Sequence, residues 1–154
     1  MKYANKTTVS AERSRNEIEQ VLIRYGAAGF MYGWKGDDAV LAFQLGQYHI
    51  RLNVPMPKKE DFKTTSNGRE RNEQNAYIAW EQATRQRWRA MLLIIKAKLE
   101  CVESGIRTFE HEFFGDIVLP NGNTMINELM PQLQAAIKDG HMGQLLLPGP
   151  KHKS

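Results

Sequence analysis

The chain has 154 residues, a net charge of +4, 42% hydrophobic and 25% charged residues, which fits a single globular domain over 1–154. One cysteine, Cys101, excludes an internal disulfide framework and favours a reducing compartment. No apolar run approaches the roughly 20 residues that cross a bilayer, and the polar N-terminus lacks the apolar centre of a secretion signal, so we expect no membrane contact and a cytoplasmic location.

The N-terminal part predicts one helix. Met1 to Val9 is polar and is expected to fray, whereas Ser10 is a suitable helix cap. The apolar residues after it recur with the period of a helix: Ile18, Val21, Leu22 and Tyr25. Gly26 is well placed to end this helix.

From Ala27 onward the apolar residues alternate, which is typical of strands. Three strand segments are separated by the turns 35–38 and 46–47, and Pro55 and Pro57 end the third because proline has no amide donor. Such short connections predict an antiparallel meander with one buried face. The next segment, of about 58–74, is polar and is expected to be a mobile loop.

A long amphipathic helix is predicted from about Gln74 to Ser104. Its apolar residues are spaced 4, 3, 4, 3 and 4 apart: Trp88, Leu92, Ile95, Leu99, Val102 and Ile106. This spacing is the strongest structural signal in the chain, and it defines one face that packs on the sheet.

The C-terminal third predicts smaller elements. We expect a helix over 106–114, a short strand at 117–119 and a last helix from Asn123 or Thr124 to Gly140, with Pro131 in its opening turn or at a break. The segment of about 141–154 is expected to be a flexible tail. The predicted fold class is therefore α+β: an N-terminal helix, a three-stranded antiparallel meander, and a long helix and smaller C-terminal helices packed on the sheet.

Residue patterns for catalysis or metal binding are missing from the sequence. Glu110-His111-Glu112 resembles part of a zinc helix, but Gly115 stands where the second histidine belongs. Cys101 lies beside the apolar face of the long helix, as a packed thiol does. No glycine-rich phosphate loop precedes a helix. We therefore predict no catalytic residue, metal or cofactor, although an enzyme of unfamiliar type stays open.

Basic side chains are concentrated around the long helix. Residues 69–98 carry seven basic and three acidic side chains, a balance of +4, whereas 99–154 carry four and seven, a balance of −3. The candidates for phosphate contact are Arg69, Arg71, Arg85, Arg87, Arg89, Lys96 and Lys98. The candidates for base stacking are Tyr32, Trp34 and Tyr48. In the alternative interpretation the aromatics belong to the core and the arginines are solvated or pair with carboxylates such as Glu81 and Glu100.

Several short segments together carry a resemblance: Lys6-Thr7-Thr8-Val9-Ser10, Arg24-Tyr25-Gly26-Ala27, Phe30-Met31-Tyr32-Gly33-Trp34, Gln86-Arg87-Trp88-Arg89, Ile95-Lys96-Ala97-Lys98-Leu99-Glu100 and Ile117-Val118-Leu119-Pro120-Asn121-Gly122. The ensemble resembles small bacteriophage and prophage proteins that have no assigned activity. The resemblance implies a bacterial host cytoplasm and a role in DNA metabolism or in interference with host defence.

The sequence supports two functional hypotheses. The first is a non-enzymatic phage-type accessory protein that binds nucleic acid and forms a homo-oligomer. Exposed aromatic side chains would suit single-stranded nucleic acid, because they can stack on its bases. The second is a protein-binding module that inhibits a host defence enzyme. This hypothesis rests on the loop of about 58–74, the apolar tail and the charge asymmetry between the helices.

Overall fold

The computed structural model describes residues 2–141 and 143–144, with side chains from residue 11, and it confirms the α+β fold. In chain order the elements are α1 (Lys2–Arg24), β1 (Ala28–Lys35), β2 (Asp38–Leu45), β3 (Tyr48–Val54), the 3-10 turn η1 (Lys59–Phe62), α2 (Glu73–Glu103), α3 (Phe109–Phe113), the 3-10 turn η2 (Phe114–Asp116) and α4 (Met125–Asp139). Most of the tail predicted for 141–154 lies outside the described residues.

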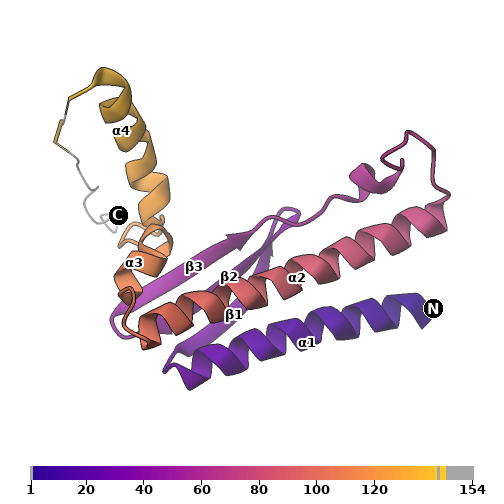
Figure 1. The fold of residues 1–154 in the computed structure, drawn as a ribbon, viewed down its shortest axis with the longest axis horizontal. Coiled ribbons are helices and arrows are strands. Elements are labelled where there is room, and N and C mark those ends of the chain that lie inside the picture. The colour runs from indigo at the N-terminus through magenta and orange to yellow at the C-terminus, as the bar shows by residue number, and fades with distance from the viewer. Residues whose placement is uncertain (1, 142, 145–154) are drawn as a thin grey trace, which may run out of the picture.

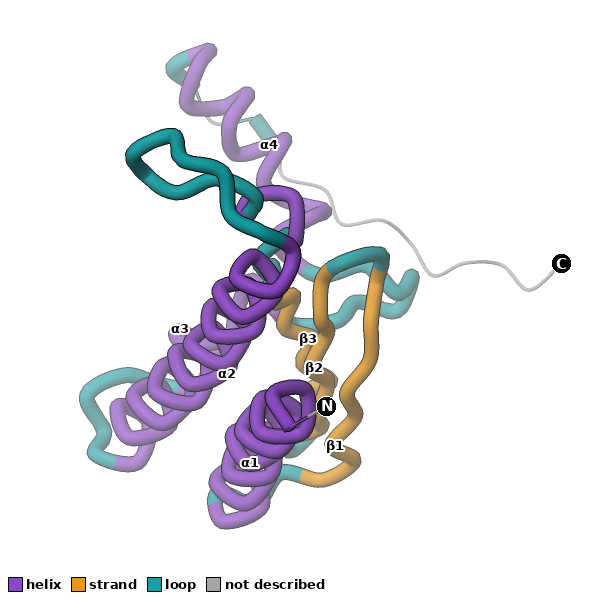
Figure 2. Tube along the Cα trace, turned by 90° about the vertical axis from the view of Figure 1, so that its right-hand side faces the viewer, coloured by secondary structure: helices purple, strands orange, loops and turns teal. Residues whose placement is uncertain are grey.

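Two long helices cover one face of the sheet. α1 and α2 lie side by side and run in the same direction (Figure 1), and both lie on the same side of the strands (Figure 2). α1 begins at Lys2, so the helix expected from Ser10 extends back over residues 2–9. This segment contains no glycine or proline that would break a helix. Asn72 caps the start of α2: its side chain accepts a hydrogen bond from the Asn75 amide at 2.7 Å.

The sheet is a meander in the order β1-β2-β3, as predicted. Both hairpins use two-residue loops that start with a glycine, Gly36 (φ 62°) and Gly46 (φ 60°). A positive φ at the first loop position is what a type II′ turn requires, so the strands return directly to antiparallel pairing. Tyr32 pairs with Leu41 and Trp34 with Ala39, which places both aromatics on the face that α1 and α2 cover.

The core lies between this sheet face and the helices. Its largest fully buried side chains come from α1, β2, β3, α2 and α3: Ile18, Leu22, Leu41, Ile50, Val54, Trp88, Ile95, Leu99 and Phe113. The 4-3 spacing of α2 therefore identified its buried face correctly from Trp88 to Leu99, whereas Ile106, also predicted for this face, lies beyond the end of α2 and is 74% exposed.

The C-terminal elements differ in detail from the prediction. The helix expected over 106–114 is the single turn α3, Phe109–Phe113, and Pro131 lies inside α4 without ending it. The loop of about 58–74 contains η1 and a bridge between Thr64 and Glu70. α4 contacts mainly η2 and projects from the body (Figure 1), so it is not laid on the sheet as expected. Among the described residues, no helix combines the length and apolar character of a membrane span.

Candidate nucleic-acid interface

The basic side chains on one flank of α2 line a groove between the two parallel helices α1 and α2. Arg85, Arg89 and Lys96 lie at helical spacing on the flank of α2 that faces α1, and Arg13 faces them from α1. The groove has a volume of about 520 Å³. Its remaining lining is Ser14, Glu17, Gln82, Gln86, Leu92 and Leu93.

The groove carries an excess of positive charge. Among the described residues that line it, the only carboxylate is that of Glu17, which lies 3.9 Å from the Lys96 ammonium, and both side chains are about half exposed. Among the described residues, Arg13, Arg85 and Arg89 form no ion pair. Four cations and one carboxylate leave a formal charge of +3 in this groove. An exposed ion pair such as Glu17–Lys96 contributes little and is easily exchanged for another anion.

Two of the predicted cations, Arg71 and Lys98, form contacts within the fold. The Arg71 guanidinium donates to the backbone carbonyls of Phe62 and Thr64 at 3.1 and 3.0 Å, which ties the loop to the start of α2. The Lys98 ammonium donates to the carbonyl of Glu112 at 2.8 Å and lies 3.4 Å from its carboxylate. Lys98 thereby fastens α3 to α2.

Two further predicted cations lie away from the groove. Arg69 is exposed in the loop before α2. Arg87 lies on another side of α2, in a hollow with Pro57, Asp61 and Phe62. The phosphate contacts predicted for both stay predictions, but neither adds to the charge of the groove.

The three predicted stacking residues have different environments. Tyr32 lies edge-on to Trp88, with ring centroids 5.4 Å apart, and its hydroxyl accepts a hydrogen bond from Arg15. Tyr48 stacks on Phe109 and donates to Glu110 at 3.2 Å. Trp34 is 57% exposed and lies at the rim of the helix-covered face. Of the three, only Trp34 is mostly exposed.

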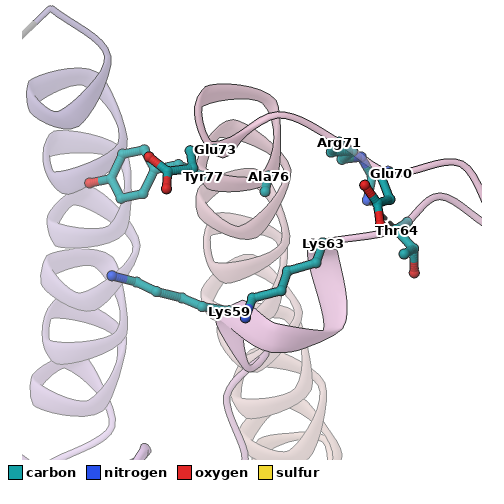
Figure 3. A pocket seen from close by; sticks show the side chains of 8 residues that line it. All are labelled: Lys59, Lys63, Thr64, Glu70, Arg71, Glu73, Ala76 and Tyr77. Atoms are coloured by element: carbon teal, nitrogen blue, oxygen red, sulfur yellow. Dashed lines mark hydrogen bonds between the residues drawn. The ribbon is translucent and has the colours of Figure 1, made fainter.

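Another cavity, of about 800 Å³, lies between η1, the loop 63–72 and the first turns of α2 (Figure 3). Lys59, Lys63 and Arg71 meet Glu70 and Glu73 there, so the charges nearly cancel. The Lys59 ammonium lies 4.6 Å from the ring of Trp80, and Arg71 is bonded to the loop. Lys59 and Arg71 are thus engaged in contacts within the protein, and the cavity is a weaker candidate than the groove.

Sequence reasoning missed Arg13. Its position on α1 shares a helix face with Glu17, four residues on, but nothing local indicates that this face meets α2. The juxtaposition depends on the parallel packing of two helices far apart in the sequence. Within the described residues no group of histidine, cysteine and carboxylate side chains has the geometry to hold a metal ion.

Comparison with known proteins gives no match: no family model, curated protein or solved structure is similar to this chain. The relation to bacteriophage proteins therefore stays a prediction.

Proposed function

We propose that the protein binds single-stranded nucleic acid, without catalysis, through the groove between α1 and α2. The observation that supports the proposal is the meeting of Arg13, Arg85, Arg89 and Lys96 in one groove with a single opposing carboxylate. Guanidinium groups suit phosphate oxygens because they donate two parallel hydrogen bonds.

The arrangement suits a polyanion better than a small anion. From Arg85 to Lys96 is eleven residues, and at 1.5 Å per residue the cations extend along about 16 Å of helix. A small anion would contact one or two of these side chains, whereas an extended strand contacts them in succession. A basic groove that tracks the backbone is the usual way in which proteins hold single strands.

The test is a binding titration with single- and double-stranded oligonucleotides at several salt concentrations. Four phosphate contacts predict that log K falls with log salt with a slope of about −3 for a single strand, since each contact releases bound counterions. Fluorescence anisotropy measures this slope. Affinity that is flat between low and moderate salt would contradict the proposal, and tighter binding of the duplex would contradict the choice of a single strand.

A second candidate, self-association, is favoured by α4. This helix exposes an apolar stripe at spacing 4, 3 and 4: Ile126, Met130, Leu133 and Ile137. The charged residues of α4 fall on other sides of the helix, so a second copy meets no like charge. An antiparallel second α4 would set Ile126 against Ile137 of the partner subunit and Met130 against Leu133 of the partner subunit.

We expect Leu133→Glu with Ile137→Glu to weaken dimerisation at least about tenfold, because each change buries a carboxylate in an apolar contact. Ala135→Glu, on the opposite side of α4, is the matched control. Sedimentation velocity over a range of concentrations measures the effect. A full chain that stays monomeric at every concentration would exclude this interface, and a dimer that forms only after removal of 145–154 would assign the stripe to the chain's own tail.

A further inference from the structure

A second cavity, of about 440 Å³, lies on the face of the sheet that α1 and α2 leave uncovered. Lys35, Val40, Arg51 and Asn53 form its floor, and the loop around Gly122 and the first turn of α4 form its wall. None of its lining residues belongs to the groove, so a ligand in this cavity is independent of the proposed function.

The start of α4 brings unpaired backbone donors to this cavity. The Met125 amide donates to the Ile117 carbonyl, and the first helical bond runs from the Glu128 amide to the Thr124 carbonyl. The amides of Ile126 and Asn127, which both line the cavity, have no acceptor among the described residues. Such amides and the positive end of the helix dipole favour an anion.

Thr124 gives a second, independent observation. It is 6% exposed and lines the cavity, yet its hydroxyl makes no hydrogen bond within the described chain. A threonine at the residue before a helix ordinarily accepts from the amide two or three residues on, and here it does not. Every fully buried side-chain polar atom of the described residues has a partner, so the Thr124 hydroxyl, which has none, is accessible, and Thr124 itself lines the cavity. A ligand oxygen there would supply the hydrogen bond that the chain does not.

Two cations face the same space. The Arg51 guanidinium donates to the Gly122 carbonyl at 2.9 Å, which fixes it against the cavity wall while it retains further donors. Lys35 is exposed at the rim. Asp116, the one carboxylate among the described lining residues, opposes an anion. Burial raises the pKa of Asp116, against the smaller lowering effect of the Lys98 charge.

We propose that this cavity binds the phosphate group of a small phosphorylated molecule. The unpaired amides of α4, the Thr124 hydroxyl, Lys35 and Arg51 together supply donors on several sides of one oxyanion. The volume lies within the roughly 300–1,000 Å³ of small-molecule sites, so there is room for a group larger than phosphate beside it. Asn53 and the Asn127 side chain lie in the cavity where they would contact that group.

The experiment is a titration of the full chain with inorganic phosphate, monitored by amide NMR and compared with chloride at equal ionic strength. We expect the amide signals of Ile126 and Asn127 to shift most. Thr124→Val and Lys35→Gln are each expected to weaken phosphate binding about tenfold, since each removes one hydrogen bond to a charged group. Asp116→Asn is expected to strengthen phosphate binding, because it removes the carboxylate that opposes an anion. A variant that only disturbed the fold would not bind phosphate more tightly.

Lys138→Gln, at the far end of α4, is the matched control and is expected to leave phosphate binding unchanged. Shifts that chloride reproduces, or an unchanged dissociation constant in Thr124→Val, would overturn the site. A nucleoside monophosphate is expected to compete for the cavity. Competition by an oligonucleotide that lacks terminal phosphates and carries only backbone phosphodiesters would instead assign the cavity to a nucleic-acid backbone and overturn the small-molecule proposal.

Discussion

Replacement of Trp88 by alanine is expected to lower the free energy of unfolding by about 3–5 kcal/mol, the usual range for a buried tryptophan. Trp88 is 1% exposed and packs edge-on against Tyr32, with the Arg15 guanidinium 5.3 Å from its ring. The side chain thus joins α2 to β1 and α1. Since small domains are stable by only about 5–15 kcal/mol, this variant is expected to be close to unfolding.

Trp34→Ala is the matched control because it removes the same side chain from a position that is 57% exposed. We expect it to cost less than about 1 kcal/mol. Urea denaturation monitored by circular dichroism measures both values. Equal losses at the two positions would mean that Trp88 does not connect the layers as described. Trp88→Phe, which keeps an aromatic ring, is expected to fall between the wild type and Trp88→Ala.

The elements that sequence predicted well are those whose pattern is set by one buried face. The 4-3 spacing around Trp88, Leu92 and Ile95 gave α2 to within a residue at each end, because packing on the sheet requires an apolar stripe at this period. The alternation of apolar residues and the glycine turns likewise predicted the three-stranded meander, because one face of the sheet is buried.

The placement of α4 could not be predicted from its pattern. Its stripe from Ile126 to Ile137 has the spacing of a core-facing helix, yet these side chains are 36–72% exposed. Apolar residues at helical spacing predict that one face of the helix is apolar, but they do not indicate which part of the protein, or which partner, covers that face. Local sequence therefore cannot distinguish a helix that packs on its own sheet from one that presents an interface.

The candidate site was predicted only in part, because charge clusters depend on tertiary structure. The basic excess around α2 is visible in the sequence, but the helix distributes it over several sides. Lys98 bonds to α3 and Arg71 bonds to the loop, whereas Arg85 and Arg89 meet Arg13 from α1. Proximity along the chain indicated which helix carries most of these cations, but it did not show which of them share one groove.

Reversal of two charges in the groove is expected to abolish binding of single-stranded nucleic acid at moderate salt. Arg85→Glu with Arg89→Glu changes the formal charge of the groove from +3 to −1. Two hydrogen bonds to charged groups contribute about 1.5–3 kcal/mol each, so the loss of affinity is expected to be at least about 100-fold. Neither arginine forms an ion pair among the described residues, so the fold should tolerate the change, which thermal unfolding verifies.

The control is Arg69→Glu with Arg87→Glu, which changes the net charge of the protein by the same amount outside the groove. If the groove is the binding surface, this pair lowers the affinity only through the long-range field, which salt screens beyond about 10 Å at 0.1 M. The difference between the two pairs should therefore persist as salt rises. Equal losses in both would mean that nucleic acid is attracted by the overall charge of the molecule, and the juxtaposition of α1 and α2 would then have no special part in binding.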